Sequence, residues 1–364
     1  MRFLHTESSK GWGGQEIRIL REALGLQKRG HEPVLAVNRG GKLIEKARRE
    51  NLTVYELDFT KWAALKTIRA LLKIIKRHDV DLVNTHSSLD AWMGGIAARL
   101  AKKAIVRTRH LSTPIRKGLN SYLLYNKLVD HVVTTSSCIL PVIAEQAHLS
   151  PAQLQCIPTG IDPAALVVDQ RQIEHFRRTL RLKPQDILVG TVCFVRSWKG
   201  IDVLLKAAEL LRHREEIKWV IVGGGYVDQY RPKVKERGLQ HAVFFTGHLE
   251  SPYAAIAAMD IFTLLSTAHE GISQATLQAA YLERPLVTTT IGGLPEVCIE
   301  GKTGILVPPF APEATADAIA RLADDNALRL ALGQEGKTLV ENRFTFQRTL
   351  DAMEAVYAQF SGIS

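Results

Sequence analysis

Short apolar segments alternate with longer amphipathic segments along most of this chain, and this alternation restricts the possible folds more than any other feature. Five apolar runs in the first half lie near residues 2–6, 33–37, 80–86, 104–110 and 131–136. Five more in the second half lie near residues 187–195, 218–225, 243–247, 260–266 and 285–290. Such runs between helical segments are typical of parallel strands that are covered by helices on both faces.

The alternation is interrupted once, at "PTGIDPAALVVDQRQ", which contains Pro158, Gly160 and Pro163. A chain of 364 residues is also too long for one ordinary core. We therefore predict an α/β fold with two doubly wound, Rossmann-like domains that face each other across a cleft. The predicted domains span residues 1–162 and 163–345, and a C-terminal helix within 346–364 is expected to pack back on the first domain. Ligands of such sheets bind at the carboxyl ends of the strands.

Positive charge is concentrated in the first half of the chain. Residues 1–162 contain 25 lysines and arginines against 14 acids, a net charge of +11, whereas residues 163–364 contain 22 against 23, a net charge of −1. This asymmetry predicts that the first domain meets an anionic surface or ligand. Nucleic acid would also fit the charge, but no nucleic-acid recognition motif is present and aromatic residues are only 7%. We expect no nucleic-acid partner.

Cysteine usage and hydropathy point to an intracellular protein. The four cysteines lie far apart and form no C-x-x-C pair, which argues against a disulfide framework or a zinc knuckle. No apolar run approaches the roughly 20 residues that span a bilayer. We predict a cytoplasmic protein, with a peripheral position on the inner face of the membrane as a further expectation.

Candidate site residues in the first half follow predicted strands. Gly13 and Gly14 open a helix in "TESSKGWGGQEI", where backbone amides could receive an anion, although a plain tight turn explains the glycines equally well. His86 and His110 end two predicted strands. A lone histidine is more often structural, but two at equivalent strand ends favour a role at a ligand site, so both interpretations stay open.

The second half has its own candidates after strands. Arg196 and Lys199 in "RSWKG" suit a diphosphate, and the less favoured alternative is that they are ordinary surface cations at a helix start. Glu270 in "STAHEGISQATLQAA" precedes an expected helix that begins at Gly271, Ile272 and Ser273. A carboxylate repels phosphate, so its natural partners are hydroxyl groups, but an acid is also favoured there by the helix dipole alone. Gln278 lies about two turns along that helix.

The segment "KWAALKTIRALLKIIKRH" is predicted to form an amphipathic helix. The helical period places Trp62, Leu65, Ile68, Leu72 and Ile75 on one face, with cations around it. The simpler interpretation packs this apolar face on the sheet. The alternative rests the flanking cations on anionic headgroups, together with "RKGLNSY" further along the chain.

The stretch "HEGISQATLQAAYLERPLVTTTIGGLPEVCIEGKTGILVPP" resembles the donor-binding signature of the family 4 glycosyltransferases, which are retaining enzymes with the GT-B fold. The resemblance extends through "IPTGID", "RSWKG", "VGGG", "FFTGH" and the early "GGQE". It implies that Glu270 contacts hydroxyls of the donor sugar and that amides of Gly271 to Ser273 meet the sugar or diphosphate. It further implies a phosphate-binding role for Lys199.

In the first half, the resemblance matches Gly13 and Gly14 to a glycine loop near the diphosphate and acceptor. His110 matches a histidine that lines the sugar site, and His86 is retained as a possible acceptor or sugar contact. Catalytic roles are therefore expected for Glu270 and His110. Donor binding is expected for Gly13, Gly14, Arg196, Lys199, Gly271, Ile272, Ser273 and Gln278.

The sequence departs from the family pattern at three places. Phe194 stands where an arginine is common, so Arg196 would have to substitute from two positions later. Gln278 stands where a second glutamate normally accepts hydrogen bonds from ribose, and an amide keeps an acceptor there without a buried charge. Thr290 stands where an acid is frequent.

The expected reaction is transfer of a sugar from a nucleotide-diphosphate sugar to a glycan or lipid-linked acceptor, as in lipopolysaccharide or other envelope polysaccharide biosynthesis. The resemblance implies retention of anomeric configuration, and without a D-x-D-like cluster we expect neither metal nor cofactor. A nucleotide-sugar epimerase of the same fold and a non-catalytic nucleotide-sugar-binding protein remain alternatives.

Overall fold

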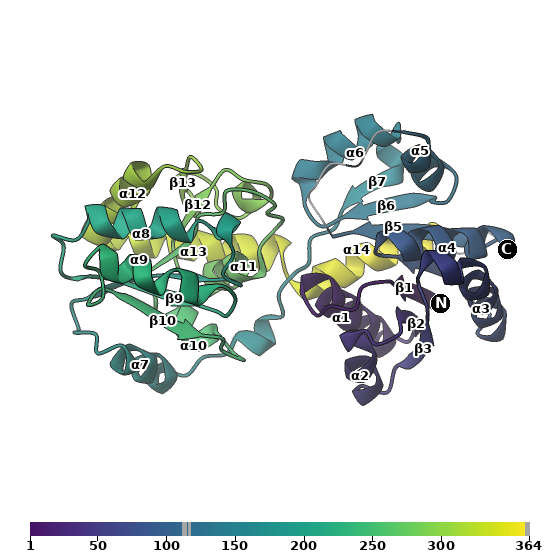
Figure 1. The fold of residues 1–364 in the computed structure, drawn as a ribbon, viewed down its shortest axis with the longest axis horizontal. Coiled ribbons are helices and arrows are strands. Elements are labelled where there is room, and N and C mark those ends of the chain that lie inside the picture. The colour runs from purple at the N-terminus through teal and green to yellow at the C-terminus, as the bar shows by residue number, and fades with distance from the viewer. Residues whose placement is uncertain (111–114, 116–117, 361–364) are drawn as a thin grey trace. The chain divides into compact units, whose positions relative to one another are not determined.

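The computed structural model describes residues 1–110, 115 and 118–360, and the chain forms two compact units (Figure 1). The first unit contains Met1–Thr159 and the C-terminal segment from Gln347, and the second contains Gly160–Phe346. The boundary predicted after residue 162 lies three residues beyond Thr159.

The first unit is built on a seven-stranded sheet with the order β3-β2-β1-β4-β5-β6-β7, in which every neighbouring pair is parallel. Its strands are β1(Arg2–Glu7), β2(Glu32–Asn38), β3(Thr53–Leu57), β4(Leu82–Thr85), β5(Ala104–Arg109), β6(His131–Thr134) and β7(Leu154–Cys156). Its helices are α1(Gly14–Lys28), α2(Lys42–Arg49), α3(Ala64–Arg77), α4(Ser88–Leu100), α5(Leu119–Asn126) and α6(Leu140–Ala147). Apolar side chains from both faces of this sheet, such as Leu4 and Leu35, lie in two separate buried clusters.

The last helix, α14(Phe346–Ala358), packs against the first unit. The ring of Tyr357 lies 4.6 Å from that of Phe3 in β1, and its hydroxyl donates to Glu22 of α1 at 2.8 Å. The Asn84 side chain donates to the same hydroxyl at 2.7 Å. The C-terminal helix is thus held by buried polar contacts as well as by apolar packing.

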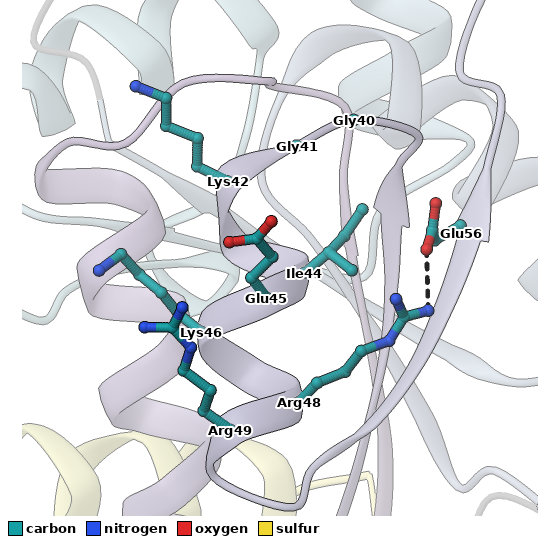
Figure 2. Close-up of a pocket in the computed structure, with 9 residues that line it drawn as sticks. All are labelled: Gly40, Gly41, Lys42, Ile44, Glu45, Lys46, Arg48, Arg49 and Glu56. Atoms are coloured by element: carbon teal, nitrogen blue, oxygen red, sulfur yellow. Dashed lines mark ion pairs between the residues drawn. The ribbon is translucent and has the colours of Figure 1, made fainter.

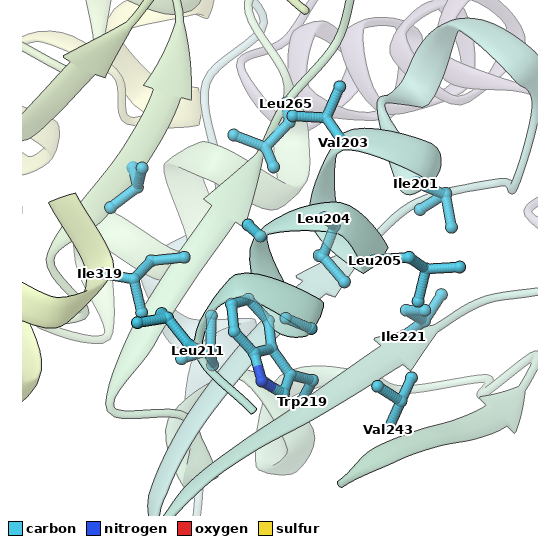
Figure 3. Close-up of a cluster of buried hydrophobic side chains, with 14 of the residues drawn as sticks. Ile201, Val203, Leu204, Leu205, Leu211, Trp219, Ile221, Val243, Leu265 and Ile319 are labelled. Atoms are coloured by element: carbon cyan, nitrogen blue, oxygen red, sulfur yellow. The ribbon is translucent and has the colours of Figure 1, made fainter. Parts of the chain in front are cut away.

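The second unit is built on a six-stranded parallel sheet with the order β10-β9-β8-β11-β12-β13. Its strands are β8(Ile187–Val192), β9(Ile217–Val222), β10(Val243–Gly247), β11(Ile261–Leu264), β12(Leu286–Thr289) and β13(Gly304–Val307). Its helices are α7(Gln170–Thr179), α8(Ile201–Leu210), α9(Arg231–Glu236), α10(Tyr253–Ala258), α11(Gln274–Tyr281), α12(Pro312–Asp324) and α13(Asn326–Arg343). Figure 3 shows part of its core, where Trp219 of β9 packs among residues of α8 and neighbouring elements.

Both sheets reverse their strand order once. The reversal lies between β1 and β4 in the first unit and between β8 and β11 in the second. At such a point the connections leave toward opposite faces of the sheet, and a crevice opens at the carboxyl ends of the two central strands. These two positions are where each unit can accept a ligand. The doubly wound fold class is confirmed, while the cleft between the domains stays a prediction.

Three strands were missed by the sequence analysis, namely β3, β7 and β13. All three lie at a sheet edge, and each is three to five residues long with partly exposed side chains. An edge strand is covered less completely than a central one, so its sequence lacks the continuous apolar run that marks a buried strand.

The predicted apolar face of the helix near residue 62 is partly wrong. A short 3₁₀ turn covers Lys61–Ala63 before α3 begins, and the α3 side chains that are buried include Leu71, Ile74 and Ile75. Trp62 is 100% exposed and Leu65 is 71% exposed. The turn places Trp62 outside the regular helix, and α3 directs Leu71 and Ile74, rather than Leu65, toward the core.

Candidate functional site

The strand reversal of the second unit brings together two of the predicted site residues. Lys199 follows β8 and Glu270 follows β11, and the Lys199 ammonium lies 2.9 Å from Oε1 and 2.7 Å from Oε2 of Glu270. The buried hydroxyl of Ser266 donates to the same Oε2 at 2.7 Å. One cation and one carboxylate, both largely buried, therefore lie side by side where this sheet can accept a ligand.

Glycines allow the backbone to approach closely at this cluster. Gly292 has a φ of +59°, and a Cβ there would lie 1.8 Å from the carbonyl oxygen of Glu270. Gly200, with a φ of +70°, would place its Cβ 1.9 Å from the carbonyl oxygen of Leu265. Any side chain would force the loops apart. Gly200 thus lets the Lys199 loop lie against the end of β11. Gly292 lets the loop that follows β12 lie against the Glu270 loop.

Arg196 lies near this pair in sequence but makes different contacts. Its guanidinium stacks over the rings of Phe194 and Trp198, at 4.9 Å and 5.1 Å from their centroids, and the side chain is exposed. Burial raises the pKa of the neighbouring Cys193 thiol to about 11, so this group is neutral. Because the Arg196 guanidinium stacks on its ring, Phe194 supports this arginine. The structure does not place Arg196 against Lys199 or Glu270.

The helix after Glu270 begins later than predicted. Gly271 and Ile272 precede it, and Ser273 is its N-cap, whose hydroxyl accepts from the Thr276 amide at 3.4 Å. An extended Ser273 that caps the helix moves the first helical residue to Gln274. Gln278 is half buried on α11, and its side-chain amide makes no hydrogen bond within the described parts of the chain.

The predicted glycine loop of the first unit opens α1, but one of its amides is already used. Gly13 is the N-cap, and its amide donates to Oε2 of Glu16 at 2.8 Å, so it is not available to an anion. Around Gly14 there is open space, because a Cβ built there would meet no atom within 4 Å. Only Gly14 retains the close backbone access that the sequence analysis expected of both residues.

A buried carboxyl group at the end of β1 was not anticipated from the sequence. Glu7 accepts from the Ser9 amide and the Ser87 hydroxyl, both at 2.6 Å, and from the Gln15 side chain. Burial, together with the nearby Asp90 carboxyl, raises the pKa of Glu7 to about 7. This group ties the glycine loop to the start of α4 at the strand reversal of the first unit.

His86 and His110 lie together, as the ends of two neighbouring strands. His86 Nδ1 is 3.0 Å from His110 Nε2, and His86 Nε2 is 3.0 Å from Nδ1 of His5 in β1. His86 is buried and both its ring nitrogens make contacts within the chain, while its contact with acceptor or sugar stays a prediction. His110 is only partly buried. His5 was not predicted as a site residue, although it lies in the strand next to that of His86.

A separate cavity of about 490 Å³ lies beside α2 (Figure 2). It carries four cations, Lys42, Lys46, Arg48 and Arg49, and two acids. Arg48 is paired with Glu56 at 2.8 Å, so three cations remain without that neutralisation. None of the predicted site residues lines this cavity, which instead adds to the positive charge of the first unit.

Two further findings concern metals and membranes. Over residues 1–110, 115 and 118–360, no group of three or more His, Cys, Asp and Glu side chains is arranged to hold a metal ion. Within the same ranges, no helix is both long and apolar enough to cross a membrane. Arg116 and Lys117 of "RKGLNSY" lie outside the described residues.

Two family models match this chain. Residues 12–165 match the model described as Glycosyltransferase Family 4, and residues 186–325 match the model described as Glycosyl transferases group 1. Together they span every predicted site residue.

Curated relatives cover most of the chain. A D-inositol 3-phosphate glycosyltransferase of Corynebacterium glutamicum is 24% identical and covers 92% of this chain and 88% of its own. The capsular polysaccharide biosynthesis glycosyltransferase CapM of Staphylococcus aureus is 21% identical, with 95% of each chain covered.

A solved structure has the same fold. HepE of Anabaena, in complex with UDP, has a TM-score of 0.88 at 19% identity over 99% of this chain and 100% of that chain. The same protein has been solved with UDP-glucose. The two family models match consecutive parts of the chain, the relatives cover more than nine tenths of it, and the fold is shared. The chain therefore belongs to the family 4, group 1 type of glycosyltransferases with the GT-B fold.

Proposed function

We propose that this chain is a retaining glycosyltransferase that moves a sugar from a nucleotide-diphosphate sugar to a hydroxyl of a glycan or lipid-linked acceptor. The observation that carries the proposal is the cluster of Lys199, Glu270 and Ser266 at the strand reversal of the second unit. A glycosyl donor presents a diphosphate and a set of hydroxyls close together. A cation beside a carboxylate complements both groups.

Each residue has a distinct role in this proposal. Lys199 offers its ammonium to the diphosphate, and Glu270 accepts hydrogen bonds from hydroxyls of the donor sugar. The half-buried amide of Gln278 accepts from the ribose. Arg196, supported by Phe194 and Trp198, supplies a second cation to the phosphates. In the first domain, His110 and the open backbone at Gly14 are the proposed donor contacts.

The chemistry follows from these charges. Lys199 and Arg196 stabilise the negative charge that develops on the departing diphosphate, which gives a metal-independent reaction. The leaving phosphate oxygen takes the proton of the acceptor hydroxyl on the face from which it departs, and the anomeric configuration is retained. Closure of the domains would exclude water, which otherwise hydrolyses the donor.

Uridine is the first base to test, because the Anabaena neighbour binds UDP and UDP-glucose. The relative named for capsular polysaccharide biosynthesis supports an acceptor in the cell envelope, and lipopolysaccharide belongs to the same class. A sugar-nucleotide epimerase or a non-catalytic binding protein of the same fold would bind the donor but would form no transferred product.

Thermal unfolding with UDP and UDP-glucose tests the donor site. A ligand at 100 times its Kd stabilises the folded state by about 2.7 kcal/mol, which raises the midpoint of a domain of this size by roughly 5–10 °C. We expect such a rise for the wild type and little or none for Lys199→Met, each measured against its own ligand-free midpoint. Lys206→Met is the matched control, because Lys206 is exposed on α8. If no UDP, ADP or GDP sugar raises the midpoint, the donor proposal is wrong.

We also propose that the first domain rests on an anionic membrane surface on the cytoplasmic side. The support is the exposed pair Trp62 and Leu65, next to the exposed cations Lys61, Lys66, Arg69 and Lys73 of the same segment. An exposed tryptophan and leucine among lysines and arginines suit the boundary between headgroups and acyl chains.

Vesicle sedimentation tests this surface. We expect binding to vesicles that contain phosphatidylglycerol, little binding to pure phosphatidylcholine, and a decline with rising salt because the attraction is electrostatic. Trp62→Ser combined with Leu65→Ser should weaken the binding severalfold. A matched control is Leu330→Ser, since Leu330 is an exposed apolar residue of the second unit. Undiminished binding by the double variant would refute the assignment of this surface.

A further inference from the structure

Three histidine rings form a hydrogen-bonded series across the strand reversal of the first unit. His5 lies in β1, His86 follows β4 and His110 follows β5, and these strands are neighbours in the sheet. The two N···N distances between successive rings are both 3.0 Å. Burial lowers the pKa of all three rings, so each is neutral near pH 7 and carries one proton.

The series has only two possible arrangements of protons. Each contact needs one proton, and each neutral ring supplies one, on either of its nitrogens. If His5 carries its proton on Nδ1, it donates to His86, and His86 and His110 must then also be protonated on Nδ1. If His5 is protonated on Nε2, all three rings are protonated on Nε2. The free nitrogen of His110, Nδ1, is therefore a donor in the first arrangement and an acceptor in the second.

The surrounding charges favour the second arrangement. Arg18 and Arg107 act on His110 and lower its pKa, whereas Glu22 acts on His5 and raises its pKa against the effect of burial. The protons of the series are thus repelled at the His110 end and attracted at the His5 end. His5 Nε2 is buried without a hydrogen-bond partner in both arrangements, as a lone pair in the first and as an N–H group in the second, so the attraction of Glu22 must offset the cost of the buried N–H group.

We propose that His5 and His86 are positioning residues that hold His110 in the Nε2–H tautomer, so that its Nδ1 accepts a hydrogen bond from a hydroxyl of the bound sugar or acceptor. His110 Nδ1 makes no hydrogen bond within the described residues. The inference rests on the proposed glycosyltransferase function for the identity of the hydroxyl donor. The tautomer itself depends only on the chain.

The tautomer of His110 is measured by nitrogen-15 NMR of the full-length protein labelled at its histidine rings, with the His110 signals assigned by loss in His110→Gln. We expect the wild type to show a protonated Nε2 and a bare Nδ1 at pH 7.5. His5→Leu removes the acceptor at the end of the series and should give a mixture of both forms. His5→Asn places an amide near the former Nδ1, and when its oxygen faces His86 it accepts from the protonated Nε2 as Nδ1 did, so the wild-type form should again predominate.

Kinetics separate the tautomer effect from simple loss of folding. In His5→Leu, kcat/KM for sugar transfer should fall roughly tenfold while UDP binding by calorimetry stays unchanged, and His5→Asn should recover most of the activity. A wild-type His110 protonated on Nδ1, or an unchanged tautomer in His5→Leu, would overturn the inference. Absence of any transfer by the wild type, with the expected NMR pattern, would instead overturn the proposed function and leave the tautomer assignment standing.

Discussion

Sugar transfer by Glu270→Ala is expected to fall by roughly 10³-fold, while UDP binding is retained. The carboxylate is proposed to accept hydrogen bonds from donor-sugar hydroxyls, and interactions of this kind in a buried site contribute roughly 10²–10³-fold to the rate. Binding of the diphosphate is proposed to depend instead on Lys199. In this variant Lys199 loses the carboxylate that partly neutralises its charge, so its attraction for the diphosphate is not weakened. Initial rates with saturating acceptor and calorimetric titration with UDP would measure the two effects.

Two controls sharpen this experiment. Glu270→Gln keeps the shape and one acceptor oxygen, so it should retain more activity than the alanine variant if hydrogen bonding to hydroxyls is the main contribution. Glu250→Ala removes an exposed acid of the same unit and should behave as wild type. Turnover at the wild-type rate in Glu270→Ala would show that this residue has no part in transfer.

The central strands were predictable because physical rules connect their burial to their sequence. A parallel strand covered by helices on both faces is buried along most of its length, as in β1, β4, β8 and β11, and its sequence therefore carries a short apolar run. The same rule fails for β3, β7 and β13 at the sheet edges, where partial exposure removes the pattern. The helical period likewise fails at Trp62, because this residue lies in a 3₁₀ turn before α3, outside the regular helix.

The site was predictable to the extent that it depends on where strands end. This rule identified four residues, namely Lys199, Glu270, His86 and His110. In the structure Lys199 contacts Glu270, and His86 contacts His110. Which side chains bond to one another depends on long-range packing that a single sequence does not show. His5 was read as part of an apolar strand, and the role of Ser266 beside Glu270 was not seen for the same reason.

A large loss of stability is expected for Arg18→Met in α1. Arg18 is fully buried, where it lies 3.4 Å from Glu22 and donates to the Ile157 carbonyl at 2.6 Å and the Thr159 hydroxyl at 3.0 Å. Removing the guanidinium leaves the Glu22 carboxylate buried, with the neutral Tyr357 hydroxyl as its one remaining donor among the described residues. Breaking a buried ion pair in this way costs roughly 3–5 kcal/mol, so urea unfolding of the first unit, followed by circular dichroism, should shift to lower urea.

The double variant Arg18→Met with Glu22→Gln shows where this loss comes from. Glutamine keeps an acceptor for Tyr357 and removes the uncompensated charge, so the double variant should recover more than half of the lost free energy of unfolding. If the double variant is as unstable as Arg18→Met alone, the hydrogen bonds to Ile157 and Thr159 carry the effect, and the argument from charge is wrong. Because Tyr357 belongs to the C-terminal helix, recovery would also show that an ion pair in α1 helps to fix that helix on the first unit.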